Sequence, residues 1–231
     1  MAGSAVPNKP VATHRLRRMK IDFVSDIACP WCAVGLNALE IALQRIGGDI
    51  PVEIHFQPFE LNPQMGPEGE DAVAYLSAKY GISAEQIAHN QAAIRERGAA
   101  VGFAFGTRAR VWNTFDAHRL LHWAGVEGAA GAQRALKHAL LQAYHGQGLN
   151  PSDAEVLASA AASAGLDETR AREVLGSDEF STEVRQAEAL WQQAGIRSVP
   201  SVVVNDRHLI QGGQPPEVFE QALRQIAAEA G

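Results

Sequence analysis

Cysteine is scarce in this sequence of 231 residues: it occurs only twice, and both copies belong to one motif, Cys29-Pro30-Trp31-Cys32. Two cysteines cannot form a framework of several structural disulfides, and they leave a tetrahedral zinc site two ligands short. His118 and His122 lie one helical turn apart, but without a further metal-ligand signature they are more typical of ordinary helix histidines. The sequence therefore predicts no metal site.

Long apolar runs and a surplus of basic residues are missing as well. No run of 18 or more apolar residues occurs, so no segment is predicted to span a membrane. The net charge is −6, and residues 1–20 hold five of the 20 Lys and Arg but none of the 26 Asp and Glu. The rest of the chain is thus more acidic still, which argues against a nucleic-acid partner. The oligomeric state is left open.

Residues 1–18 are basic but lack the apolar stretch of about 7–15 residues that a secretory signal requires. We expect them to form a disordered tail. This pattern favours the cytoplasm, where stable disulfides are rare and a Cys-X-X-Cys motif is usually catalytic or redox-sensing.

The two cysteines lie where a short β-prone run, residues 20–24, gives way to an amphipathic helix. Cys29 is the expected N-cap of that helix, and Pro30 takes the first helical position. The Cys29 sulfur should accept hydrogen bonds from the backbone N–H groups of Trp31 and Cys32 at the positive end of the helix dipole. Both effects favour the thiolate, which is the nucleophile in thiol–disulfide exchange. Cys29 is therefore predicted to attack and Cys32 to resolve, without a bound cofactor and with glutathione as a possible co-substrate.

The remaining pattern places β-prone segments near both ends of the chain. A strand is predicted at 52–57, and a hairpin at 201–204 and 208–211 precedes a last amphipathic helix. Helices are predicted between them at 72–80, from 83, at 113–125, 133–144 and 150–164, from 167, and at 177–195. Because helices divide the strands into two groups, the predicted fold class is α/β with a large all-helical insertion.

This order of elements around a CPWC motif resembles the DsbA-like branch of the thioredoxin superfamily. It is most similar to the FrnE-type dithiol oxidoreductases, which are related to 2-hydroxychromene-2-carboxylate isomerases and kappa-class glutathione transferases. The matching segments, besides the motif, are Asp22-Phe23-Val24-Ser25-Asp26, Leu61-Asn62-Pro63, Asn113-Thr114 with Ala117-His118-Arg119-Leu120, Val199-Pro200-Ser201 and Gly212-Gly213-Gln214. The resemblance implies a thioredoxin-like domain of residues 19–63 and 196–231, with a helical domain of residues 64–195 inserted between its βαβ and ββα halves.

The resemblance also implies roles for residues outside the motif. Pro200 should follow a cis peptide bond and face the CPWC, and the backbone of Val199 should pair with an extended substrate segment. Asp22 is the candidate for a buried acid that takes the proton of the resolving cysteine, while Asp26 is nearer in sequence but equally typical of a solvated loop.

Two residues of the predicted insertion, Asn113 and His118, line the cleft by resemblance. Each also has a plain structural interpretation, Asn113 as a helix cap and His118 as a helix-surface residue.

Trp31 is expected to tune the motif. Strongly oxidising relatives carry histidine at this position, and its positive charge stabilises the thiolate and the reduced enzyme. A neutral indole lacks that charge, so the predicted pKa of Cys29 is higher than in those relatives and the predicted reduction potential lies between theirs and that of thioredoxin.

Thiol–disulfide oxidoreductase is the function these observations favour. A glutathione-dependent isomerase or transferase is the first alternative, although such relatives usually carry serine where Cys29 stands. A non-catalytic peptide-binding chaperone is the second, and a redox sensor ranks below both. The expected partners are disulfide- or thiol-containing proteins or small molecules.

Overall fold

The computed structural model describes residues 18–229. The prediction of a disordered tail at 1–18 therefore falls, apart from Arg18, outside the described residues. Within the described range no helix is long and apolar enough to cross a bilayer.

A four-stranded mixed sheet forms the centre of the molecule, in the order β2-β1-β5-β6. Strand β1 (Met19–Ser25) pairs in parallel with β2 (Val52–Pro58) and antiparallel with β5 (Ser201–Val204), which pairs antiparallel with β6 (His208–Gln211). The first and last parts of the described chain thus share one sheet. The α/β fold class predicted from the sequence is confirmed.

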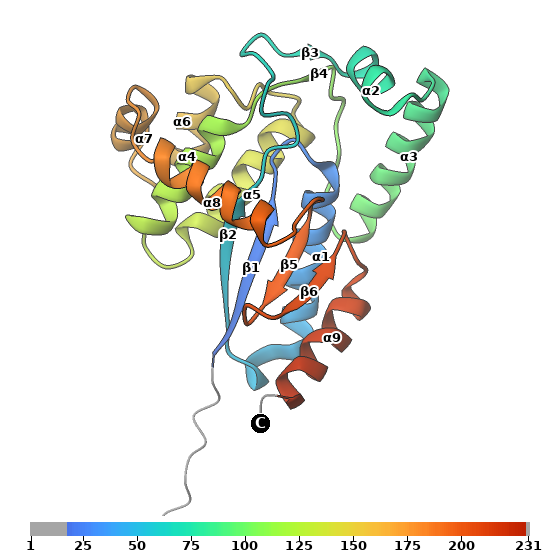
Figure 1. Cartoon of the computed structure of the whole chain (residues 1–231), viewed down its shortest axis with the longest axis vertical. Helices are drawn as coiled ribbons and strands as arrows, with labels where there is room; N and C mark the ends of the chain where they lie inside the picture. Colours follow the sequence, from blue (N-terminus) through green and yellow to red (C-terminus); the bar gives the residue numbers. More distant parts are fainter. Residues whose placement is uncertain (1–17, 230–231) are drawn as a thin grey trace, which may run out of the picture.

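Two helices cover one face of this sheet, α1 (Pro30–Ile46) and α9 (Pro216–Glu229) (Figure 1). Buried apolar side chains of both helices join those of β1 and β5 in the main core, including Phe23, Leu39 and Phe219. Strand residues alternate between faces, so Val24 packs on the opposite side in a second cluster with Phe59 and Ile196.

The other helices come from the middle of the chain and form two groups around one end of the sheet (Figure 1). One group holds α2 (Ala72–Tyr80) and α3 (Ala84–Ala100), and the other holds α4 (Phe115–Val126), α5 (Ala132–Leu141), α6 (Ala154–Ser163), α7 (Glu168–Leu175) and α8 (Ser181–Gln193). Short elements connect them, namely β3 (Glu70–Asp71), β4 (Arg110–Val111), the 3-10 turn Gly47–Asp49 and the π turn Gln142–Gly146. The division into two domains stays a prediction.

Local signals set several helix starts as predicted. Ser83 and Gln86 form a capping box at α3, and the Asp167 side chain caps α7. Helix α6 begins later than predicted, because the Asp153 side chain accepts from the first free amides of the helix.

Helix α8 also begins later than predicted, at Ser181 instead of Ser177. The Arg119 guanidinium donates to the backbone carbonyls of Val174, Ser177 and Glu179 and so holds the preceding turn in place. The Ser177 hydroxyl then serves that turn, where it accepts from the Glu179 amide. A long-range contact therefore overrides the local capping signal.

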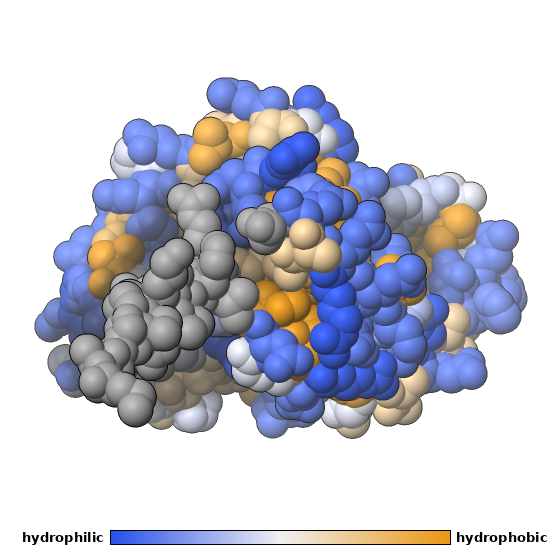
Figure 2. All heavy atoms as spheres, turned by 90° about the horizontal axis from the view of Figure 1, so that it is seen from below, coloured by the Kyte–Doolittle hydropathy of each residue, from blue (hydrophilic) through white to orange (hydrophobic). Residues whose placement is uncertain are grey.

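The end of the molecule farthest from the helical groups is mostly hydrophilic where its surface is visible, with small separate hydrophobic areas (Figure 2). Two cavities lined by Pro30 lie at the opposite end, where α1 begins.

Candidate active site

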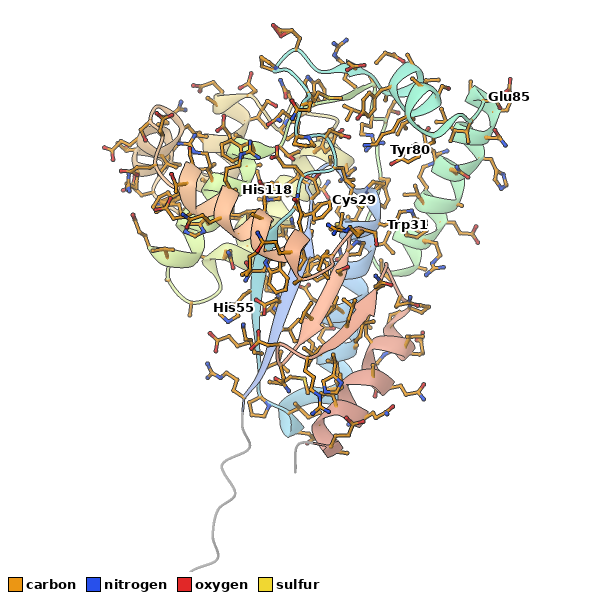
Figure 3. The ribbon with its side chains drawn as sticks, in the orientation of Figure 1. Cys29, Trp31, His55, Tyr80, Glu85 and His118 are labelled. Atoms are coloured by element: carbon orange, nitrogen blue, oxygen red, sulfur yellow. The ribbon has the colours of Figure 1, made fainter. Side chains whose placement is uncertain are left out.

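The CPWC motif forms the start of α1, at the end of the sheet where the two helical groups meet (Figure 3). Cys29 is the N-cap with an extended backbone, and Pro30 opens the helix, as predicted. Both cysteines are free thiols. Cys29 is 4% exposed and Cys32 is fully buried.

The Cys29 sulfur does not make the helix-capping hydrogen bond that the sequence predicted. Its thiol turns instead toward the Val199 carbonyl, to which it donates at 3.5 Å. The pKa of Cys29 is still lowered, first by the hydrogen bond from the Cys32 thiol. The nearby N–H dipoles of Cys32 and Trp31 lower it further, although neither forms a helix-capping hydrogen bond, while burial and the charge of Asp26 oppose the shift. The predicted direction of the pKa shift stands, although its leading cause is a side chain.

The pKa of Cys32 is shifted in the opposite direction. Burial raises its pKa well above the ordinary value, and the nearby Cys29 adds to the shift. The two thiols are therefore unequal: one favours the thiolate, and the other holds its proton.

The Val199–Pro200 peptide bond is cis. Pro200 lies against α1, where a Cβ added at Gly35 would come within 3.0 Å of the proline ring and 3.3 Å of the Gly213 backbone. Glycine at position 35 is thus required for the close approach of these two loops to the motif. Gly213 in turn packs against Trp31.

Asp22 does not lie beneath the motif. It is buried, but it accepts a hydrogen bond of 2.6 Å from the Gln57 side chain and forms an ion pair of 3.0 Å with Lys20. Alternation along β1 explains the difference, because Phe23 packs on the face covered by α1 and Asp22 points to the other face. The role expected for Asp22 is not supported by this geometry.

Asp26 occupies the position next to the motif instead. This fully buried carboxylate accepts hydrogen bonds from the Ala28 and Leu61 amides and the Thr114 hydroxyl, and it lies 3.4 Å from the His118 ring. Burial raises its pKa, but the His118 contact and the other hydrogen bonds outweigh this and hold the pKa below 3.8. Asp26 thereby ties the loop before Cys29 to two other parts of the chain.

Replacing Asp26 with asparagine is expected to lower the unfolding free energy by about 3 kcal/mol at neutral pH, because it removes a buried charge from its donors. The ionised form stabilises the fold above the ordinary pKa of 3.8, and this contribution is lost as the pH falls through the lower pKa of the folded state. The difference in unfolding free energy between the wild type and D26N should therefore be constant near neutrality and shrink below pH 3.8. Urea unfolding over a pH series measures it, and a constant difference at all pH values would contradict the assignment.

Lys137 was missed by the sequence analysis. It comes from α5, is fully buried, and its ammonium nitrogen has no hydrogen-bond partner among the described residues. Burial lowers its pKa, and its positive charge acts to lower the pKa of Cys32. Together with His118 and Leu121, it lines a cavity of about 20 Å³ beside β2.

The two residues expected to line the cleft are placed elsewhere. Asn113 lies one residue before Thr114, the N-cap of α4, where it accepts from the Phe115 amide and donates to Glu60. His118 is buried against Asp26 and is not a surface residue. Neither side chain lines the large cavity beside Cys29.

That large cavity has a volume of about 660 Å³. Cys29 and Val199 lie on one side of it, and α2 and α3 form the other, with Tyr80 above the motif (Figure 3). Its remaining lining is mainly apolar, including Leu61, Leu76, Ile87 and Ile94. The attacking sulfur thus opens onto a space within the range of about 300–1,000 Å³ that is typical of small-ligand sites.

Among the described residues, no group of three or more His, Cys, Asp or Glu side chains is arranged to hold a metal ion.

Comparisons with known proteins agree with this geometry. The family model of the DsbA-like thioredoxin domain matches residues 20–224. The chain is similar to a probable DsbA oxidoreductase from Streptomyces coelicolor, with 37% identity and a TM-score of 0.83 over 90% of this chain and 89% of that one. It is 27% identical to YwbO of Bacillus subtilis, strain 168, over 88% of this chain and 94% of that protein.

A 2-hydroxychromene-2-carboxylate isomerase shares the fold, with a TM-score of 0.68 and 15% identity over 91% of this chain and 97% of that one. The resemblance stated from the sequence is therefore confirmed. The chain belongs to the DsbA-like thioredoxin domain family, which includes oxidoreductases of the DsbA type.

Proposed function

We propose that the protein is a thiol–disulfide oxidoreductase in which Cys29 attacks and Cys32 resolves. The observation that carries this proposal is the unequal pair of thiols in one helical turn, of which the one with the lowered pKa opens onto the large cavity. A thiolate attacks disulfides, whereas a protonated thiol does not.

In the first step the Cys29 thiolate attacks a substrate disulfide, and a mixed disulfide forms as one substrate thiolate leaves. Cys32 must then lose its proton to attack the Cys29 sulfur, and the second substrate thiolate leaves. Because the pKa of Cys32 is high, this second step needs a proton acceptor. Lys137 is the acceptor we propose, since burial lowers the pKa of its amine and no carboxylate or carbonyl of residues 18–229 accepts a hydrogen bond from it.

The Val199 backbone is the proposed contact for a substrate segment beside Cys29. Support comes from the hydrogen bond between the Cys29 thiol and the Val199 carbonyl, because half-buried Val199 lines the same large cavity as the reacting sulfur. The cis Pro200 that follows packs on α1 behind the motif.

The test is to incubate the fully reduced protein with a disulfide-bonded protein and with a small disulfide, and to count free thiols over time. We expect two thiols per chain to disappear together and to return on addition of a dithiol. Loss of a single thiol, or none, would contradict the proposal.

A glutathione-dependent isomerase is the second candidate, because the cavity beside Cys29 is of small-molecule size and the isomerase fold is shared. The two functions differ in their need for Cys32. Isomerase activity that survives C32S with no dithiol cycle in the wild type would favour the second candidate.

Replacing Trp31 with histidine is expected to make the protein a stronger oxidant. An added positive charge stabilises the Cys29 thiolate and thus the reduced form. For the wild type we expect a potential between about −270 and −120 mV, and W31H should raise it by about 30 mV for each tenfold change in the exchange equilibrium. Equilibration with a glutathione redox buffer measures both values, and a lower potential in W31H would contradict the expected role of Trp31.

We also propose that the protein works in the cytoplasm, because both cysteines of the chain belong to the reactive motif and none is used for a structural disulfide.

A further inference from the structure

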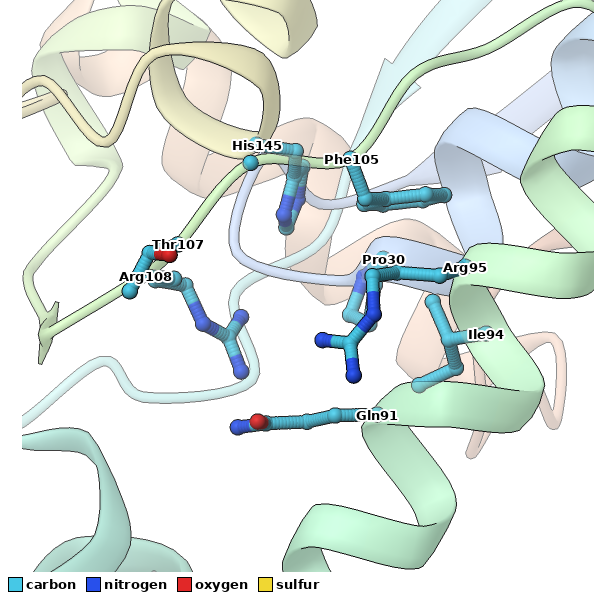
Figure 4. A pocket seen from close by; sticks show the side chains of 9 residues that line it. Pro30, Gln91, Ile94, Arg95, Phe105, Thr107, Arg108 and His145 are labelled. Atoms are coloured by element: carbon cyan, nitrogen blue, oxygen red, sulfur yellow. The ribbon is translucent and has the colours of Figure 1, made fainter.

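A second cavity of about 180 Å³ adjoins the large one. Pro30, Gln91, Ile94 and Arg108 line both cavities, so the two spaces meet next to the first residue of α1. The smaller cavity lies between α3 and the segment 105–108, and the guanidinium groups of Arg95 and Arg108 point into it from opposite sides (Figure 4).

The charges around these cavities are all of one sign. Lys79, Arg95, Arg108 and Arg197 contribute to the linings, and none of the described lining residues is acidic. Elsewhere, arginines commonly pair with carboxylates, as Arg134 does with Glu40. Around the cavities, and within the described residues, these four cations have no carboxylate within ion-pair distance. In a chain of net charge −6, this is a local concentration of positive charge.

Arg108 is held in place without its charge being neutralised. Its guanidinium donates to the Ala28 carbonyl at 3.1 Å, next to Cys29, and lies over the ring of the buried Tyr144 at 5.6 Å. Both partners are neutral, and the neighbouring Arg95 carries the same charge. Two cations that face one cavity repel each other, and a bound anion removes that repulsion.

We propose that the two cavities together bind a small disulfide that carries a carboxylate, with the carboxylate between Arg95 and Arg108 and the sulfur–sulfur bond beside Cys29. This inference rests on the proposed function and names its substrate class. The cavity size favours a small molecule, because α2 and α3 wall the space opposite Val199 and about 660 Å³ lies within the range of small-ligand sites. Arg108 lines the same cavity as Cys29, and Pro30, the residue after Cys29, lines the cavity that Arg95 enters, which suits a carboxylate a few bonds away from the disulfide.

The protein dithiol supplies both electrons of the exchange, so no further reductant is needed. The Cys29 thiolate forms a bond to one substrate sulfur, and the first substrate thiolate leaves with the electron pair of the broken sulfur–sulfur bond. Cys32 then gives up its proton and displaces the second thiolate from Cys29. That proton ends on one product thiolate, and the other product thiolate takes from the solvent the proton that Cys29 released when it ionised. The protein loses two electrons and becomes a disulfide, and the substrate gains two electrons and becomes two thiols.

The test compares three small disulfides that differ in charge: dithiodipropionate, bis(2-hydroxyethyl) disulfide and cystamine. The rate of each with reduced protein is divided by its rate with a free dithiol, which removes differences in intrinsic reactivity. We expect the anionic disulfide to exceed the neutral one by about tenfold at low ionic strength, because a cavity of one charge sign concentrates its counter-ion. The cationic disulfide should be slowest, and added salt should reduce the differences.

Variants locate the effect. R95Q and R108Q should each lower the ratio of anionic to neutral rates several-fold, whereas R207Q should leave this ratio unchanged, since Arg207 is a cation of the β5–β6 turn outside both linings. Because the Arg95 side chain is exposed and makes no hydrogen bond within the described residues, R95Q is expected to fold even if R108Q does not.

Equal normalised rates for the three disulfides would overturn the inference while the oxidoreductase proposal stands. A charge preference seen only with disulfides between acidic peptides would also overturn it. The absence of exchange with every disulfide would instead refute the proposed function.

Discussion

Replacing Cys32 with serine is expected to stop the reaction after its first step and to leave one substrate molecule joined to Cys29 in each chain. The attacking thiol of this variant is intact, and a serine hydroxyl can still donate a hydrogen bond to its sulfur. The resolving thiol is gone, so the mixed disulfide cannot be released from within the protein. Mass spectrometry after brief exposure to a disulfide should show a single adduct at Cys29 and loss of multiple turnover.

The matched control is C29S, which keeps Cys32 but removes the attacking sulfur. Cys32 is fully buried and its pKa is raised, so this variant should form no adduct on the same timescale. An adduct at Cys32 in C29S, or steady turnover in either variant, would show that the roles of the two cysteines are not as proposed.

Replacing Lys137 with methionine is expected to slow the resolving step about 100-fold, which is the usual effect of losing a proton acceptor. The same change should raise the unfolding free energy by about 1–3 kcal/mol. It replaces a buried amine, which has no hydrogen-bond partner in the part of the chain that the structure describes, by an apolar chain of similar length. The pH dependence has a defined sign. The folded-state pKa of Lys137 lies below its ordinary value of 10.5, so the free energy of unfolding decreases as the pH falls from 10.5 to the folded-state pKa. K137M should remove this pH dependence.

Single-turnover measurements separate the two steps. In the wild type, release of the mixed disulfide should speed up as the pH rises through the pKa of Lys137, because the free amine is the acceptor. K137R provides the control, since arginine keeps the positive charge but cannot accept a proton. Release of the mixed disulfide in K137R should be slow at every pH, as in K137M. If K137M is more stable than the wild type but releases the mixed disulfide at the wild-type rate, Lys137 has a structural role and is not the proton acceptor.

The sequence predicted those parts of the fold that depend on local signals. The helix start at Cys29-Pro30 is one, and the capping box of Ser83 and Gln86 is another. Both depend on residues within one turn of each other. The start of α8 could not be predicted in this way, because Arg119 holds the preceding turn from another helix.

The same distinction applies to the candidate site. The family resemblance pointed to Asp22 as the buried acid, yet the alternation of β1 turns Asp22 to the far face, and Asp26 reaches Leu61 and Thr114 across the fold. Lys137 appears in the sequence as one polar residue on an amphipathic helix. In the sequence Lys137 stands among the leucines at 136, 140 and 141, all of which are buried in the structure. A lysine within this group of leucines was the one sequence signal that could have identified Lys137 as buried.

Arg95 and Arg108 carry no such signal. Each is a basic residue in an exposed or half-exposed segment, and only the folded chain brings them to opposite sides of one cavity. Their shared feature is the missing acidic partner, which depends on contacts between segments far apart in the sequence.

The most direct test of the account is the pH dependence of alkylation at Cys29 in the reduced wild-type protein, followed by mass spectrometry to identify the modified residue. Alkylation requires the thiolate, so the rate reports the fraction of ionised sulfur. The account predicts a midpoint below that of free cysteine, about 8.5, with Cys32 unmodified over the same range. A midpoint at or above the value of free cysteine would contradict it, because neither sulfur would then be a ready nucleophile near neutrality.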